Sequence, residues 1–212
     1  LAFATARRVP LVYASSASVY GAGRDFRVSE DCERPINVYA FSKLMFDRHV
    51  RQVAGGFRSP VIGFRYFNVY GPGEAHKGSM ASVIHHFRGQ LKAGDEIRLF
   101  TGSDGYGDGV QVRDFIHVDD VVAANLWAWQ RAAKSGIYNL GTGEARSFND
   151  VARAVLKWHG RGAIRYVPFP DHLRGSYQSY TQADLTGLRA AGYDAGFIPV
   201  DEGVPRYLDA VA

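Results

Sequence analysis

The chain has 212 residues, of which 46% are hydrophobic and 22% are charged, and its formal net charge is +4. This composition is typical of a globular protein that can bury a sizeable core. No apolar run approaches the roughly 18 residues that a membrane span needs, and no signal peptide is visible, so we predict no membrane contact.

The basic residues are dispersed along the chain, and 20 of the 25 are arginines. Without a long Lys/Arg run, this pattern favours a solvated surface over nucleic-acid binding. A mild positive charge would also attract a small anionic substrate such as a nucleotide sugar. The single cysteine, Cys32, excludes an internal disulfide and indicates a reducing compartment, which we predict to be the cytoplasm.

The predicted elements alternate between strands and helices. In chain order, apolar runs rich in β-formers predict strands at 9–16, 59–71, 96–102, 112–118, 136–143 and 163–170. Helical patterns predict helices at about 38–54, 78–94, 119–133, 147–160, 182–191 and 201–211. Because this alternation favours right-handed βαβ units, we predict an α/β fold with a parallel sheet.

Residues typical of helix ends mark several of these boundaries. We expect Ser79 near the start of its helix and Gly94 just after its end. Asp119 or Asp120 is expected to cap the third helix, and Ser147 the fourth.

Three predicted strand ends carry small polar residues, in "ASSAS", "YFNVYG" and "NLGTG". In open parallel sheets, ligands lie beyond the carboxyl ends of the strands. These three stretches therefore predict one binding rim.

Tyr39 and Lys43 lie four residues apart on a predicted helix, so both project from one face. The pair alone is weak evidence, since chance supplies about 0.3 such pairs in a chain of this composition, and an ordinary surface helix is the alternative. The chemistry adds weight, because a nearby ammonium favours the phenolate form of tyrosine. A serine at the adjacent strand end, such as Ser16, could hold a substrate alcohol.

Several stretches resemble the extended short-chain dehydrogenase/reductase family of nucleotide-sugar epimerases and dehydratases: "SSASVYG", "YAFSK", "RYFNVYGPG", "VRDFIHVDDVV" and "NLGTG". Longer segments are similar to the members that invert C6 of an ADP-linked heptose: "INVYAFSKLMFDRHVRQ", "GFRYFNVYGPGEAHKGSMASV" and "YVPFPDHLRGSYQSYTQADLTGLRAAGYD". The resemblance covers nearly the whole chain. It implies an NADP-dependent isomerase that supplies heptose for lipopolysaccharide, with a nucleotide sugar as substrate and a homo-oligomeric state.

The resemblance also implies residue roles. Tyr39 matches the catalytic tyrosine, and Lys43 matches the lysine that binds the cofactor ribose beside it. Ser16, in preference to Ser15, matches the serine that holds the substrate oxygen, and Lys77 matches a second acid/base. Tyr39, Lys43 and Val69 would contact the cofactor, for which NADP is expected and NAD is the alternative. The implied substrate contacts are Asn68, Ser79, His86, Phe100, Thr101, Gly102, Ser103, Arg113 and Tyr177. No metal site is expected.

Simpler interpretations remain open for some of these residues. Asn68 is also a common turn former, and His86 could be a partly buried helix histidine. Arg113 precedes Asp114 and could form a structural ion pair with it, although an arginine fork also suits a diphosphate. The glycines at 105–109 predict a flexible loop in preference to a phosphate cradle.

A dinucleotide fold of this type should carry a glycine-rich turn after its first strand, and none with the required spacing occurs here. The chain also lacks an initiator methionine, so we expect it to begin mid-protein, with the C-terminal part of a Rossmann-type sheet and a smaller α/β substrate domain. Residues 1–212 alone are therefore expected to be inactive. The predicted cofactor-domain segments are 1–66, about 115–144 and 180–194. The predicted substrate-domain segments are 67–114, 145–179 and 195–212.

Two other functions remain in view. One is a UDP-sugar 4-epimerase or a dTDP-sugar dehydratase, although Ala17 and Ser18 stand where a dehydratase usually has an acidic pair. The other is a non-catalytic remnant that binds a sugar nucleotide. The intact Ser16, Tyr39 and Lys43 argue against such a remnant, whereas the missing glycine turn argues for it.

Overall fold

The computed structural model describes residues 1–131, 134–175 and 177–212. Its helices are α1 (Ala2–Arg7), α2 (Val38–Val53), α3 (Val83–Ala93), α4 (Val118–Gln130), α5 (Phe148–His159), α6 (Thr186–Ala190) and α7 (Val200–Ala210). Its strands are β1 (Leu11–Ser16), β2 (Val61–Tyr66), β3 (Asn68–Tyr70), β4 (Glu96–Phe100), β5 (Val112–His117), β6 (Gly136–Leu140), β7 (Ala145–Ser147) and β8 (Ala163–Val167). Short 3₁₀ turns are η1 (Ala17–Tyr20), η2 (Glu30–Cys32), η3 (Ala54–Gly56), η4 (Ala75–Met80) and η5 (Asp171–Leu173).

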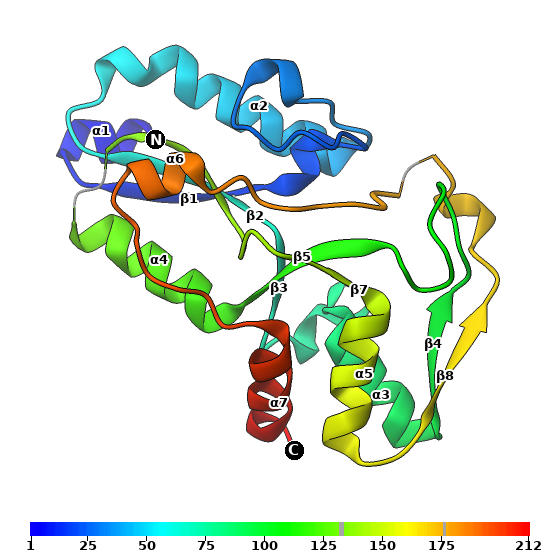
Figure 1. Ribbon diagram of the computed structural model, residues 1–212. Coiled ribbons are helices and arrows are strands. Elements are labelled where there is room, and N and C mark those ends of the chain that lie inside the picture. Colours follow the sequence, from blue (N-terminus) through cyan, green and yellow to red (C-terminus); the bar gives the residue numbers. More distant parts are fainter. Residues whose placement is uncertain (132–133, 176) are drawn as a thin grey trace.

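The first sheet is parallel, with strand order β1-β2-β6. Helices α2 and α4 lie on its two sides (Figure 1). Ile62, Phe64, Ile116 and Leu140 are fully or almost fully buried in the cluster beside it. Because a parallel sheet needs cover on both faces, this arrangement confirms the predicted α/β class.

Two smaller sheets build the rest of the molecule. Strand β5 pairs in parallel with β3 and antiparallel with β7, and β4 pairs in parallel with β8. Helices α3, α5 and α7 pack together around Ile84, Val155 and Val204, below β3, β5 and β7 and beside β4 and β8 (Figure 1).

The single strand predicted at 59–71 is wrong, because the structure divides it into β2 and β3. At Phe67 the backbone amide bonds the carbonyl of Leu140 at 3.0 Å, and the Val69 amide bonds back to the Phe67 carbonyl at 3.0 Å. This tight turn moves the chain from the first sheet to the second, and so Asn68 begins a new strand.

One helix begins later than predicted, and one predicted helix cap is wrong. Helix α3 begins at Val83 with Ser82 as its cap, because the carboxylate of Glu74 fixes both the amide and the hydroxyl of Ser82. Helix α4 is capped by the ring of His117, which accepts a hydrogen bond from the Asp119 amide.

The other helix ends agree more closely with prediction. Ser147 caps α5 in a reciprocal capping box with Asp150, and Gly94 follows α3. The helix predicted at 182–191 shortens to α6, and residues 132–133 of the helix predicted at 119–133 lie outside the described residues. Within the described ranges, no helix is long and apolar enough to cross a membrane.

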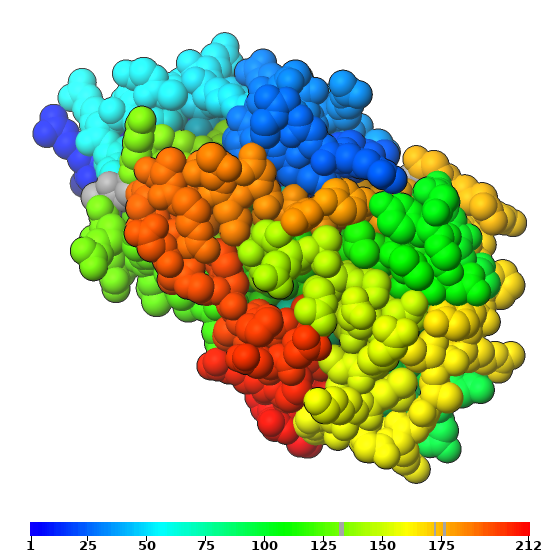
Figure 2. Space-filling model, viewed as in Figure 1, coloured from blue at the N-terminus to red at the C-terminus, as the bar shows by residue number. Residues whose placement is uncertain are grey.

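Segments that are far apart in sequence adjoin on the surface shown in Figure 2. There the blue segment after η1, the green loop after β4 and the orange segment before α6 lie next to one another. They meet on the side to which the carboxyl end of β1 leads, where the sequence predicted a binding rim (Figure 1).

Candidate active site

The two serines at the end of β1 have different environments. Ser15 is buried and donates a hydrogen bond to Asp47 Oδ2 at 2.9 Å. The Oγ of Ser16 accepts hydrogen bonds from the Ser18 amide at 3.2 Å and the Ser18 hydroxyl at 2.9 Å. Successive side chains point to opposite faces of a strand, and this geometry favours Ser16 as the serine that faces a ligand.

Helix α2 carries Tyr39 and Lys43 to the same strand. The side chain of Asn37 caps the helix by accepting a hydrogen bond from the Ala40 amide at 2.8 Å. Lys43 Nζ donates to the carbonyl of Ala14 at 3.0 Å and lies 5.8 Å from the centre of the Tyr39 ring. Tyr39 is 57% exposed, so its phenol is accessible to a ligand at the rim.

A buried charge cluster, formed by Glu33, Asp47, Arg51 and Arg65, lies behind this pair. Arg65 Nε donates to Asp47 Oδ2 at 3.0 Å, and its terminal nitrogen contacts both Asp47 and Glu33. Arg51 adds two hydrogen bonds to Glu33, at 2.5 and 3.0 Å. Burial raises the pKa of Glu33, but the hydrogen bonds from Arg51 and Arg65 outweigh burial and hold that pKa below its usual value.

Beyond the rim lies a cavity of about 550 Å³, which we name the substrate cavity. Its size is typical of a small-molecule site. Five of the predicted substrate contacts line it, namely Asn68, Ser79, Phe100, Arg113 and Tyr177. These five predicted contacts come from five separate segments, β3, η4, β4, β5 and the stretch between η5 and α6, which the fold brings together.

Arg113 supplies the buried cation of this cavity. It is 6% exposed, and its guanidinium lies 4.7 Å from the centre of the Tyr177 ring and 5.6 Å from that of Phe148. Burial lowers the pKa of Arg113, and Tyr177 partly offsets this effect. Within the described residues no carboxylate pairs with it, so an anion in the cavity would offset the cost of burying the charge.

The alternative interpretation of Arg113, an ion pair with Asp114, is wrong. Asp114 instead accepts hydrogen bonds from the backbone amides of Thr142, Gly143 and Ala183, at 2.7 to 2.9 Å. The stretch "NLGTG" therefore folds around a buried carboxylate. A β-carbon at Gly141 would lie 2.6 Å from Asp114 Oδ2, which explains the glycine there.

The remaining predicted contacts, Thr101, Gly102, Ser103 and His86, lie outside the lining of the cavity. Gly102 donates its amide to Asp108 Oδ1, Thr101 Oγ1 accepts the Phe169 amide, and the Ser103 hydroxyl accepts from the Gln111 side chain. His86 Nε2 lies 3.3 Å from the carbonyl of Ser79, which lines the cavity. None of these four predicted contacts is among the residues lining the cavity, so their direct roles stay predictions.

Lys77 and Val69 are less closely tied to the rim. Lys77 is exposed in η4, and none of the contacts in the described residues joins its ammonium to Tyr39 or Ser16. Val69 packs against the core of the first sheet. Both assignments therefore stay predictions. Among the described residues, no group of three His, Cys, Asp or Glu side chains could hold a metal ion.

Some residues of the cavity were missed by the sequence. They are Met80, Ala81, Val83, Phe87, Arg98, Leu99, Gly109, Gln111 and Phe148. Most are apolar and follow the same patterns as core residues, so no sequence signal distinguishes them. Gln111 is 2% exposed and bonds to Ser103 and to the Thr101 carbonyl, which holds the loop after β4 in place.

Comparison with known proteins adds to this geometry. Residues 1–141 match the model of the NAD dependent epimerase/dehydratase family. The chain belongs to this family. It is 56% identical over 206 residues to ADP-L-glycero-D-manno-heptose-6-epimerase of Alkalilimnicola ehrlichii, a match that covers 97% of this chain and 64% of the relative.

Solved structures of epimerases agree with the family fold. The Helicobacter pylori ADP-L-glycero-D-manno-heptose-6-epimerase superposes with a TM-score of 0.85 at 32% identity, over 99% of this chain and 62% of that one. A Thermus thermophilus UDP-glucose 4-epimerase in complex with NAD gives 0.75 at 29% identity, over 95% of this chain and 63% of that one. The chain thus spans less than two thirds of the length of these family members.

Proposed function

We propose that the protein inverts C6 of ADP-D-glycero-D-manno-heptose, as an NADP-dependent epimerase that supplies heptose for lipopolysaccharide. The observation that carries this proposal is the 56% identity with the Alkalilimnicola ehrlichii relative over 97% of the chain. That relative is far more similar to this chain than the UDP-glucose 4-epimerase, at 29%. The identity supports a heptose substrate over the UDP-sugar alternative.

The rim fits a nicotinamide cofactor through Lys43. Its ammonium donates to one carbonyl, that of Ala14, and an ammonium has two further protons to give to ribose hydroxyls. Val69, in β3 of the neighbouring sheet, would border the nicotinamide ring of the cofactor. When bound, the cofactor would serve as the acceptor of the hydride that leaves the substrate. We propose NADP in this role, with NAD as the alternative that the Thermus thermophilus complex supports for its own enzyme.

The side chains at the rim would move the protons. Tyr39 would accept the proton of the C6 hydroxyl while the C6 hydrogen leaves as a hydride to the bound nicotinamide cofactor, and C6 would become a ketone. Ser16 donates a hydrogen bond to the C6 oxygen. When the hydride returns to the opposite face of the C6 ketone, the ketone oxygen needs a proton from an acid on the other side of the sugar. We assign this role to Lys77.

The substrate cavity would hold the nucleotide part of the substrate. Arg113 has no carboxylate partner among the described residues and suits a diphosphate, because charge-assisted hydrogen bonds to a buried guanidinium are strong. We divide the chain accordingly: 1–66, about 115–144 and 180–194 serve the cofactor, and 67–114, 145–179 and 195–212 serve the substrate.

The test is direct conversion. The protein is purified at the length of its heptose-epimerase relatives and incubated with ADP-D-glycero-D-manno-heptose and with NADP, NAD or neither, and the two C6 epimers are separated by chromatography. We expect conversion that is fastest with NADP. No conversion, or turnover of UDP-glucose at a similar rate, would contradict the proposal.

A variant tests the role of Tyr39. Tyr39→Phe keeps the ring and removes the hydroxyl, so we expect turnover to fall about 10²–10⁴-fold. Tyr166→Phe, at an exposed tyrosine on β8, is the matched control and should stay near wild type. Turnover of Tyr39→Phe within about threefold of wild type would remove Tyr39 from the mechanism.

A further inference from the structure

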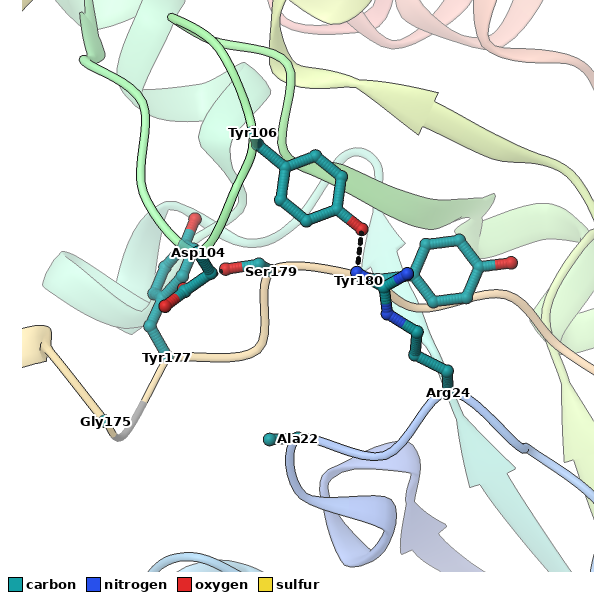
Figure 3. Close-up of a pocket in the computed structure, with 8 residues that line it drawn as sticks. All are labelled: Ala22, Arg24, Asp104, Tyr106, Gly175, Tyr177, Ser179 and Tyr180. Carbon is teal, nitrogen blue, oxygen red and sulfur yellow. Dashed lines mark hydrogen bonds between the residues drawn. The ribbon is translucent and has the colours of Figure 1, made fainter.

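A second cavity of about 210 Å³, which we name the side cavity, opens next to the substrate cavity. Tyr177 lines both cavities, so they share a wall. Figure 3 shows that the side cavity is formed by three parts of the chain: Ala22 and Arg24 after η1, Asp104 and Tyr106 in the loop after β4, and a third set before α6 made of Gly175, Tyr177, Ser179 and Tyr180. Apart from Tyr177, no role has been assigned to these side chains above.

The side cavity lies close to the predicted catalytic serine. Only η1 and Gly21 separate Ser16 from Ala22, and a four-residue 3₁₀ turn spans about 8 Å. The side chain of Gln178 donates a hydrogen bond to the carbonyl of Gly21 at 2.6 Å and so ties residues 177–180 to the end of η1. The side cavity therefore borders the rim through η1 and borders the proposed diphosphate site through Tyr177.

The polar groups of the side cavity include both donors and acceptors. Arg24 donates to the Tyr106 hydroxyl at 3.4 Å, a long contact, and no carboxylate of the described residues lies within ion-pair distance of its guanidinium. Asp104 accepts a hydrogen bond from the Ser179 hydroxyl at 2.5 Å, and its carboxylate has capacity for more. Figure 3 shows these two groups on different sides of the side cavity.

This combination selects one ligand chemistry. A phosphate would be attracted by Arg24 but repelled by Asp104. An apolar group would displace water from both charged side chains and offer them no hydrogen bond in return. A sugar hydroxyl both donates and accepts, so vicinal hydroxyls can satisfy the carboxylate and the guanidinium together. The volume is below the range for a drug-sized ligand, as a site for one sugar ring would be.

We propose that the side cavity binds the sugar ring of the nucleotide sugar, with Arg24 and Asp104 as the residues that recognise its hydroxyls. The inference rests on the proposed function, which puts the nucleotide in the substrate cavity and C6 near Ser16. In that pose the sugar ring lies between the substrate cavity and Ser16, beside Tyr177. Arg24 and Asp104 then determine specificity for the sugar and leave the nucleotide untouched.

The test compares two probes, ADP and ADP-mannose, by calorimetric titration of the purified protein. The variants are Arg24→Gln and Asp104→Asn. Asp104 has φ of 54°, a region that asparagine tolerates, so the second variant keeps the turn. The matched control is Arg161→Gln, at an exposed arginine between α5 and β8.

We expect each variant to weaken ADP-mannose binding about tenfold while ADP binding stays within about twofold of wild type, and the control to change neither. Unchanged ADP-mannose affinity in both variants would overturn this inference but leave the proposed function standing. An equal loss for ADP and ADP-mannose would also overturn it, since the side cavity would then serve the nucleotide. If the wild-type protein bound neither probe, the proposed function itself would fail, and the inference with it.

Discussion

Removal of the Arg65 guanidinium should be among the most destabilising single changes in this chain. In Arg65→Met the side chain keeps much of its volume, but Asp47 and Glu33 lose their shared cation in a site where all three side chains are 0% exposed. Removing one partner from a buried ion pair typically costs about 3–5 kcal/mol.

The remaining partners place the expected loss at the lower end of that range. Glu33 keeps its two hydrogen bonds from Arg51, and Asp47 keeps those from the hydroxyls of Tyr13 and Ser15. We therefore expect Arg65→Met to lower the free energy of unfolding by about 3 kcal/mol.

The assay is urea unfolding followed by circular dichroism, with the free energy extrapolated to zero urea. Arg161→Met is the control, because Arg161 and Asp95 form an exposed pair at 3.5 Å that should contribute less than about 1 kcal/mol. A loss below about 1 kcal/mol for Arg65→Met would refute the reasoning, since the buried charges would then be satisfied in some other way.

Three further predictions concern other parts of the molecule. Lys77→Met should impair epimerisation strongly while NADP affinity, measured by fluorescence titration, stays near wild type; unchanged epimerisation would exclude Lys77. Because the folded state holds the pKa of Glu33 below its ordinary value of 4.5, the stability gained from Glu33 is present above that pH and lost as pH falls below it, and Glu33→Gln should flatten this acid limb in urea titrations. Ser147→Ala removes the capping box of α5 and should lower the free energy of unfolding by about 1 kcal/mol, whereas Ser79→Ala, in η4 ahead of the cap of α3, should leave stability unchanged.

The sequence predicted those features that depend on neighbours along the chain. The Tyr39 and Lys43 pair was found because helical spacing puts residues four apart on one face. The cap at Ser147 was found because its partner Asp150 lies within the same turn. The predicted substrate contacts Asn68 and Tyr177 came from resemblance to a family, and no local pattern would have placed them in one cavity.

The features that were missed depend on distant partners. The break at Phe67 is decided by the carbonyl of Leu140, in a strand that the sequence gave no reason to pair there. The cap of α4 depends on how the ring of His117 turns at the end of β5, and the two acidic residues next to it looked better suited. Arg24 and Asp104 line one cavity only because the fold brings the loop after β4 next to the segment after η1.

The buried charge cluster links the predicted helix pair, Tyr39 and Lys43, to contacts with distant strands that the sequence did not predict. Asp47 lies one helical turn after Lys43, and it accepts hydrogen bonds from Tyr13 and Ser15 of β1 and from Arg65 of β2. Apolar packing of equal volume could stabilise the fold as well or better, because desolvating charges is costly. Hydrogen bonds are directional, however, and bonds from two strands to one carboxylate fix how far α2 can slide along the sheet. That position decides whether Lys43 reaches the Ala14 carbonyl, and therefore whether the helix and the strand end can act on the same ligand.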